Sequence, residues 1–135
     1  MDIALASDAE GLHIGEDDML PDIVRRFLPD KIIGYSANEI ELAMKYRDFV
    51  DYFGVGAVFP SETKKKPTIS LAILKEIKEY TQKPVVAIGG ITIDNVKEVL
   101  KYRVDGVAVA KGLLDTDDIE SRAREFRKII DNCLK

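Results

Sequence analysis

Short apolar runs alternate along this chain with longer segments in which apolar residues recur at helical spacing. A run of four to eight apolar or β-branched residues is typical of a buried strand, and recurrence every three or four residues is typical of a helix with one buried face. The runs predict five strands, at residues 11–15, 31–36, 51–60, 84–90 and 105–112. The helical pattern is found at residues 2–10, 17–28, 38–49 and 119–133. Two further helices are indicated by Ile69, Ile73 and Ile77, and by Val96, Val99 and Leu100.

Polar residues at the expected helix starts support this division. Asn38, followed by Glu41 three residues later, matches a capping box, in which the two side chains bond backbone N–H groups of the first turn. Thr92 or Asp94 is the expected cap of the fifth helix. The last helix, from Ile119 to about Cys133, carries the most regular apolar stripe.

Strict alternation of strands and helices predicts an α/β fold with a parallel sheet and right-handed crossovers. The strands are nearly continuous apolar runs, so we expect both faces of the sheet to be covered. An open doubly wound sheet and part of a (β/α)₈ TIM-type barrel both fit. A complete barrel requires roughly 200–250 residues, and the 135 residues here hold about five of its eight units.

The helical segment at residues 2–10 has no strand ahead of it. This order favours a truncated barrel, a single partial domain over residues 1–135 that begins after the third strand and lacks the three N-terminal strands. Five such strands leave two open edges and an uncovered interior, and open edges favour pairing with another chain. We therefore expect a homo-oligomer, or a complex with a separate N-terminal half-barrel partner.

Composition excludes several classes of function. The net charge is −4, and the longest basic run is the three residues from Lys64 to Lys66, so no nucleic-acid partner is expected. No apolar stretch approaches the ~18 residues of a membrane span, and no signal-peptide pattern is present. The single cysteine, Cys133, forms neither an internal disulfide nor a cysteine-rich metal site. A cytoplasmic protein without a membrane partner is expected.

Active sites of parallel α/β folds lie at the carboxyl ends of the strands. The first strand ends at Gly15 and is followed by Glu16, Asp17 and Asp18, three carboxylates that suit a hard cation. An acidic start of the next helix, favoured by the helix dipole, is the alternative. The second strand ends at Ser36, which is either a turn or capping residue or a ligand contact.

The last three strand ends suit a phosphate group. The third is followed by Ser61–Lys66, whose hydroxyls and cations fit phosphate or pyrophosphate, although a solvated basic loop has the same composition. The fourth ends at Gly89 and Gly90, and the fifth at Lys111 and Gly112. Barrels frequently bind phosphate at their last two strands, through loops and a helix N-terminus. Glycine-rich turns without a ligand are the alternative.

His13, the only histidine, lies within the first expected strand. No second histidine or nearby cysteine accompanies it as a metal ligand. A structural role and a catalytic role both remain open, and the pattern favours the structural one.

The segments GLHIGEDD, KIIGYS, DYFGVGAVFPSETKK, PVVAIGGIT and DGVAVAKGLL resemble, in order and spacing, the thiamine phosphate synthase family and the related thiazole tautomerase (TenI) group. The resemblance runs from about Asp2 to the last helix and is most specific in the third and fourth segments. It implies a transferase of thiamine biosynthesis that joins an aminopyrimidine diphosphate to a thiazole phosphate and releases pyrophosphate with the help of Mg²⁺.

The resemblance also assigns roles to residues. It makes Asp18 a magnesium ligand, places Ser36 near the pyrimidine, and brings Lys64 to the pyrophosphate, so Ser36 and Lys64 are the catalytic candidates. The remaining candidates would bind the thiazole phosphate: Ser61, Glu62, Thr63, Gly89, Gly90, Ala110 and Lys111.

Several positions depart from the family pattern. Lys111 stands where the family usually has a small hydroxyl residue, and either strengthens anion binding or crowds the site. Asn38 stands where the synthase and the tautomerase usually have histidine, which makes the tautomerase reaction doubtful. The family's pyrimidine-diphosphate motif and a second metal ligand are expected ahead of Met1.

Three functions are therefore open. The chain is part of a synthase whose remaining groups come from another subunit, a non-catalytic module that binds thiazole phosphate or another phosphate ester, or a component whose main role is assembly.

Overall fold

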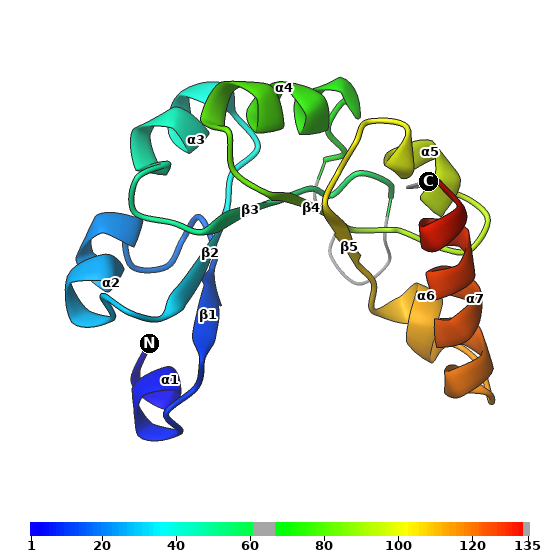
Figure 1. The fold of residues 1–135 in the computed structure, drawn as a ribbon, viewed down its shortest axis with the longest axis horizontal. Coiled ribbons are helices and arrows are strands. Elements are labelled where there is room, and N and C mark those ends of the chain that lie inside the picture. Colours follow the sequence, from blue (N-terminus) through cyan, green and yellow to red (C-terminus); the bar gives the residue numbers. More distant parts are fainter. Residues whose placement is uncertain (61–66, 134–135) are drawn as a thin grey trace.

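Five parallel strands follow one another across a curved sheet, and the helices lie on its convex side (Figure 1). The computed structural model describes residues 1–60 and 67–133. Each strand pairs in parallel with the next one in the chain. The elements are α1 (Asp2–Ala6), β1 (Gly11–Ile14), α2 (Pro21–Phe27), β2 (Ile32–Ser36), α3 (Ile40–Tyr46), β3 (Tyr52–Val55), α4 (Ala72–Thr81), β4 (Val85–Ile88), α5 (Val96–Leu100), β5 (Gly106–Ala108), α6 (Lys111–Leu114) and α7 (Ile119–Cys133).

The core lies between the sheet and the helices. Ile33, Phe53 and Val85 occupy one face of successive strands and are fully buried, as are Val24 of α2 and Leu74 of α4. Burial of a large apolar side chain contributes about 1.5–3 kcal/mol. This layer fixes the sheet against the helices and thereby places the carboxyl ends of all five strands along one rim.

The concave face of the sheet carries glycine, polar and apolar residues. Strand alternation and the pairing register place these residues on it: His13, Gly34, Ser36, Tyr52, Gly54, Val86, Ile88, Gly106 and Ala108. Within residues 1–60 and 67–133, no helix covers this face (Figure 1). The expectation that both faces are covered is therefore wrong for the described part of the chain. Val86 and Ile88 on this face are instead typical of the interior of a barrel, which branched side chains fill.

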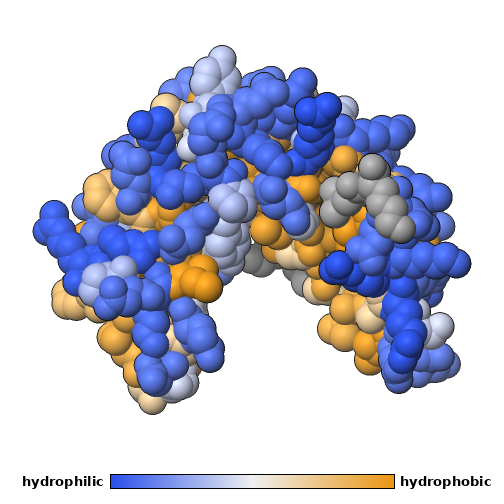
Figure 2. Space-filling view, viewed as in Figure 1, coloured by the Kyte–Doolittle hydropathy of each residue, from blue (hydrophilic) through white to orange (hydrophobic). Residues whose placement is uncertain are grey.

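The sheet is open, as expected for part of a barrel. β1 and β5 each pair with only one neighbour in the described part of the chain. The molecule forms an arch with β1 in one leg and α6 and α7 in the other (Figures 1 and 2). The five parallel strands and the open sheet confirm the truncated-barrel prediction.

None of the predicted capping residues, Asn38 and Thr92 or Asp94, caps its helix. α3 begins at Ile40 with Glu39 at its N-cap, and no side chain caps it, so the capping box at Asn38 is wrong. α5 begins at Val96 after Asn95, likewise without a side-chain cap. The last helix has the bounds expected for it. No helix of the described residues is both long and apolar enough to cross a membrane.

Candidate active site

An open cavity of about 940 Å³ lies at the carboxyl ends of the strands. Residues that follow each of the five strands contribute to its wall. Six of the candidate site residues line it: Asp18, Ser36, Gly89, Gly90, Ala110 and Lys111. The strand topology thus brings together residues that are up to 93 positions apart in the sequence, as expected for a site at the rim of a parallel sheet.

Asp18 closes the turn that follows β1. Its Oδ2 accepts a hydrogen bond from the N–H of Gly15 at 2.8 Å, and its own N–H donates to the Gly15 carbonyl at 3.2 Å. α2 begins only at Pro21. The acidic run therefore does not form the first turn of the helix, and the alternative of an acidic helix start is wrong. Asp18 is exposed on the cavity wall instead.

Ser36 ends β2 and contacts the imidazole of His13. The Nε2 atom of His13 lies 2.9 Å from Ser36 Oγ, and its Nδ1 atom lies 3.1 Å from the hydroxyl of Tyr52. The expected turn or capping role of Ser36 does not describe this position. Sequence reasoning missed the contact because a strand pattern does not show which face becomes the interior of a barrel.

Partial burial of the imidazole lowers the pKa of His13, and the Asp18 carboxylate raises it by a smaller amount. The net shift is downward. The neutral ring therefore dominates at neutral pH, with one nitrogen as donor and the other as acceptor.

Asn38 holds the end of β3. Its Nδ2 donates to the Gly56 carbonyl at 2.8 Å, and its Oδ1 accepts from the Gly56 N–H at 2.9 Å. A more distant contact of 3.4 Å joins Nδ2 to Glu16. Asn38 and Gly56 both line the cavity. An imidazole at position 38 would not present an adjacent donor and acceptor to one residue in this way.

Gly89 and Gly90 form a turn that only glycine accommodates. Their φ values are +98° and +65°, and a Cβ at Gly90 would lie 2.5 Å from the Phe59 carbonyl oxygen. Asn95 supports the turn, donating to the Gly90 carbonyl at 2.9 Å and accepting from the Thr92 N–H at 2.8 Å.

The conformation of the turn therefore explains why glycine occupies both positions, but it leaves backbone N–H groups of the turn without a hydrogen-bond acceptor among the described residues. Within the described residues, the N–H groups of Gly89 and Gly90 donate no hydrogen bond. Backbone N–H groups at a cavity wall are suitable donors to a phosphate oxygen.

The wall opposite the acidic turn is built by β5, α6 and α7. Lys111 begins α6, and Arg122 lies in the first turns of α7 and donates to the Gly112 carbonyl at 3.3 Å. Both cations line the cavity. Arg122 was not predicted, because its position in a helix with many charged residues resembles that of an ordinary surface arginine. Four candidates, Ser61, Glu62, Thr63 and Lys64, lie outside the described residues.

The carboxylates on the cavity wall are too few to form a complete magnesium site, but they supply some of the oxygen ligands that Mg²⁺ prefers. No group of three histidine, cysteine or acidic side chains within residues 1–60 and 67–133 is arranged to hold a metal. Mg²⁺ is commonly held by one or two carboxylates together with substrate phosphates and water. Asp18 and its neighbour Glu16, both on the cavity wall, supply a donor set of this smaller kind.

Comparison with known proteins relates the chain to one family. The family model for thiamine monophosphate synthase matches residues 1–113. The thiamine-phosphate synthase of Clostridium tetani is 47% identical over 129 residues, which are 93% of this chain and 62% of that protein. The thiamine-phosphate synthase of Pyrococcus furiosus is 41% identical over 99% of this chain and 66% of its own length.

Solved structures show the same relationship. The thiamine phosphate pyrophosphorylase of Pyrococcus furiosus superposes with a TM-score of 0.88 at 40% identity, over 99% of this chain and 65% of that one. A 3-hexulose-6-phosphate synthase, at 16% identity and a TM-score of 0.71, shares the fold alone. The chain spans somewhat less than two thirds of the length of these curated relatives. On the match of the family model and of these relatives, the chain belongs to the thiamine monophosphate synthase family.

Proposed function

We propose that this chain forms the thiazole-phosphate side of a thiamine-phosphate synthase active site. The main support is the turn at Gly89 and Gly90, whose two N–H groups lie at the wall of a cavity that also contains Lys111 and Arg122. Two cations and two backbone donors on one wall favour a phosphate monoester as ligand. Membership of the family identifies thiazole phosphate as the ester to test first.

The proposed reaction transfers the pyrimidine methylene group. The thiazole nitrogen forms a bond to the methylene carbon, the bond from that carbon to the diphosphate oxygen breaks, and the electron pair leaves with pyrophosphate. Catalysis then consists of holding the two substrates in line and stabilising the negative charge on the leaving group.

The residues of this chain divide between these two tasks. Gly89, Gly90, Ala110 and Lys111 are proposed to hold the thiazole phosphate, and Ser36 to orient the pyrimidine. Beyond the described residues, Ser61, Glu62 and Thr63 stay predicted contacts of the thiazole phosphate, and Lys64 a predicted contact of pyrophosphate. Asp18 would hold Mg²⁺, which, when bound, would neutralise charge on the diphosphate.

The other half of the site is proposed to come from outside the described sheet. A second copy of the chain would cover the open edges, whereas a separate half-barrel partner would both cover them and supply the groups that bind the diphosphate. The assembly is proposed to be cytoplasmic.

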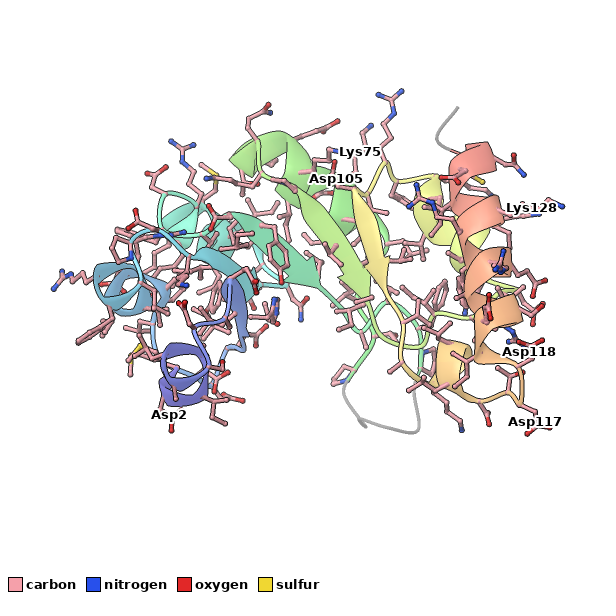
Figure 3. All side chains as sticks on the ribbon, turned by 60° about the horizontal axis from the view of Figure 1, so that its bottom comes forward. Asp2, Lys75, Asp105, Asp117, Asp118 and Lys128 are labelled. Atoms are coloured by element: carbon pink, nitrogen blue, oxygen red, sulfur yellow. The ribbon has the colours of Figure 1, made fainter. Side chains whose placement is uncertain are left out.

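Isothermal titration with thiazole phosphate tests the proposal. We expect the wild-type chain to bind the ester, and Lys111→Ala to weaken binding roughly tenfold, the effect of one charge-assisted hydrogen bond. Lys128→Ala is the matched control, because Lys128 is an exposed lysine of α7 that points away from the sheet (Figure 3). A folded chain that does not bind the ester, or equal losses in both variants, would contradict the proposal.

A turnover assay separates the enzyme from a non-catalytic module. Aminopyrimidine diphosphate and thiazole phosphate are incubated with the chain, alone and together with a separately produced half-barrel from a relative, and thiamine phosphate is measured. Formation of thiamine phosphate in the mixture supports the synthase. Binding of thiazole phosphate without turnover in either sample supports the phosphate-ester binding module instead.

A further inference from the structure

The concave face of the first three strands holds a chain of three side chains that ends at the cavity. Tyr52 of β3 contacts His13 of β1, and His13 contacts Ser36 of β2, at 3.1 and 2.9 Å. The rings of His13 and Tyr52 lie 5.5 Å apart between centroids, tilted by 36°. Of the three residues, only Ser36 lines the cavity. Tyr52 and His13 therefore affect a ligand in the cavity only through Ser36.

Two glycines make room for this arrangement. A Cβ at Gly34 of β2 would overlap the Tyr52 ring and lie 2.5 Å from His13 Nδ1. A Cβ at Gly54 of β3 would lie 2.7 Å from His13 Cε1. The imidazole thus occupies space that the side chain of a larger residue at position 34 or 54 would fill. Its position between the two hydroxyls is fixed by the sheet, since strands β1, β2 and β3 are held in register.

The hydrogen bonds allow two arrangements of protons on a neutral imidazole. In one, Tyr52 donates to Nδ1, and the Nε2–H donates to Ser36 Oγ. In the other, the Nδ1–H donates to Tyr52, and Ser36 donates to Nε2. A phenolic hydroxyl is a good donor, and burial raises the pKa of Tyr52, so its proton is retained at neutral pH.

The surroundings of Tyr52 decide between the two arrangements. Within the described part of the chain, His13 Nδ1 is the only hydrogen-bond partner of the Tyr52 hydroxyl. The second arrangement would leave the phenolic proton without an acceptor there. Each arrangement leaves one hydroxyl proton without an acceptor among the described residues: that of Ser36 in the first, and that of Tyr52 in the second. Ser36 lines the cavity, where a ligand or water accepts its proton, whereas Tyr52 is half-buried and does not line the cavity. The first arrangement is therefore favoured.

We propose that Tyr52 is a positioning residue that fixes His13 as the Nε2–H tautomer, and that His13 thereby presents the Ser36 hydroxyl to the cavity as a hydrogen-bond donor. A site built this way selects a ligand with an acceptor atom, such as a ring nitrogen or an ether or phosphate oxygen, opposite Ser36. Only the identity of that ligand rests on the proposed function; the tautomer is a property of the free protein.

Nitrogen-15 NMR of the imidazole tests the proposal directly, because His13 is the only histidine and gives one set of signals. Above the pKa of His13, we expect Nε2 to be protonated and Nδ1 to be a hydrogen-bonded acceptor nitrogen. Tyr52→Phe should shift the Nδ1 signal towards that of an acceptor without a hydrogen bond and leave Nε2 nearly unchanged. Ser36→Ala should do the reverse, with the larger change at Nε2.

Tyr80→Phe is the matched control, since Tyr80 is exposed on α4 and lies outside this chain of contacts. It should change neither nitrogen. A proton on Nδ1 in the wild-type protein would overturn the proposal, as would an Nδ1 signal that is insensitive to Tyr52→Phe while the variant keeps its thermal unfolding transition. The measurement needs no ligand, so a failure to bind thiazole phosphate would overturn the proposed function and leave this inference intact.

Discussion

At the scale of single residues, the side-chain amide of Asn38 fixes the end of a strand at the cavity. It pairs with both the N–H and the carbonyl of Gly56. The end of β3 in turn packs closely on β4, because Val58 donates to the Ile88 carbonyl and Phe59 to the Gly89 carbonyl. Asn38 therefore supports the glycine turn of the proposed phosphate site through the end of one intervening strand, β3.

Replacement of Asn38 by aspartate should destabilise the protein. The carboxylate keeps an acceptor for the Gly56 N–H but faces the Gly56 carbonyl without a proton to donate. A lost hydrogen bond with a partly buried, unsatisfied carbonyl costs about 1–3 kcal/mol. Urea unfolding measures the loss, and Asn132→Asp at the exposed end of α7 is the control. Equal stability of the two variants would show that the amide does not hold the strand end.

Because of His13, the stability of the folded protein should decrease as the pH falls below about 6.5. The pKa of His13 is lowered in the folded protein from the ordinary value of 6.5, so the unfolded chain takes up the proton first as the pH falls. The stabilisation from the neutral ring is present above about pH 6.5 and is lost as the pH falls through the folded-state pKa. The difference in unfolding free energy between wild type and His13→Asn should therefore be smaller at about pH 5 than at about pH 8. A difference that is constant or grows on acidification would contradict this.

At the scale of elements, the end of the sheet opposite the cavity carries the same contact twice. Asp51, just before β3, accepts the N–H of Ile33 at the start of β2 and pairs with Arg25 of α2, both at 2.7 Å. Asp105, just before β5, accepts the N–H of Val85 at the start of β4 and pairs with Lys78 of α4, both at 2.8 Å.

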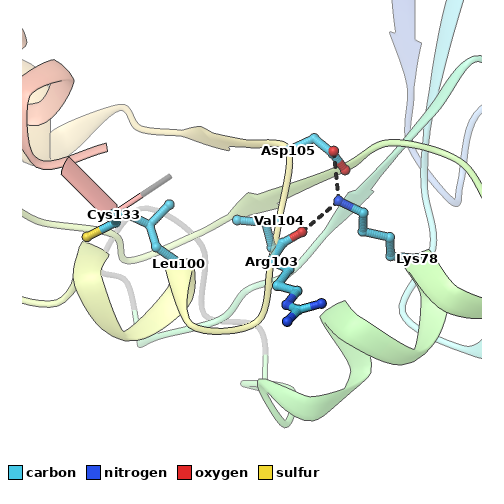
Figure 4. A pocket seen from close by; sticks show the side chains of 6 residues that line it. All are labelled: Lys78, Leu100, Arg103, Val104, Asp105 and Cys133. Carbon is cyan, nitrogen blue, oxygen red and sulfur yellow. Dashed lines mark hydrogen bonds and ion pairs between the residues drawn. The ribbon is translucent and has the colours of Figure 1, made fainter. Parts of the chain in front are cut away.

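Each aspartate thus ties a helix, its following strand and the next strand together. Figure 4 shows the second of these contacts, in which Lys78 also donates to the Arg103 carbonyl at 2.7 Å. The recurrence divides the sheet into two similar units of helix, strand, helix and strand.

The backbone hydrogen bond should matter more than the ion pair in both contacts. Asp51 and Asp105 are 47% and 40% exposed, and an ion pair at such exposure contributes only about 0–1 kcal/mol. Asp51→Asn keeps an acceptor for Ile33, whereas Asp51→Leu removes it and should cost about 1–3 kcal/mol. The same order is expected for Asp105→Asn and Asp105→Leu near Val85. Urea unfolding of the four variants decides the point, and equal losses for the amide and the leucine would assign the effect to charge.

The order and type of all elements except α6 could be predicted from the sequence, because burial on one side produces local patterns. Lys111 and Gly112, which were expected at the end of the last strand, begin α6 instead. Runs of apolar residues locate the strands, and the bounds of α7 agree with its stripe. Asn38 could not be placed correctly, since its spacing to Glu41 fits a local capping motif while its actual partner, Gly56, is 18 positions away. The partners of His13, Ser36 and Tyr52, could not be predicted, because they come from other strands that no local pattern identifies. Arg122 was missed because its place on the cavity wall depends on the packing of α7 beside α6.

At the scale of the whole molecule, the arch leaves apolar surface beside its open edges. Ile3 and Leu5 of α1 are 77% and 50% exposed, and Ile119 of α7 is 46% exposed. Figure 2 shows hydrophobic surface on both legs of the arch, next to the gap between them. Five of eight barrel strands correspond to about 63% of a barrel, which agrees with the 62–66% of the relatives' length that this chain spans. The geometry therefore favours an additional (β/α) segment or a second copy against these edges.

Association through the edges predicts how the chain behaves in solution. Exposed strand edges and apolar helix faces favour pairing, so light scattering at micromolar concentration should show an oligomer or, with a half-barrel from a relative, a stable complex. The double substitution Ile3→Lys with Leu5→Lys places two charges beside β1 and should shift the protein towards monomer. Tyr80→Lys, which charges an equally exposed site on the convex side, should not. A wild-type chain that stays monomeric and binds no half-barrel would contradict this prediction, because the open edges would then be stable without a partner.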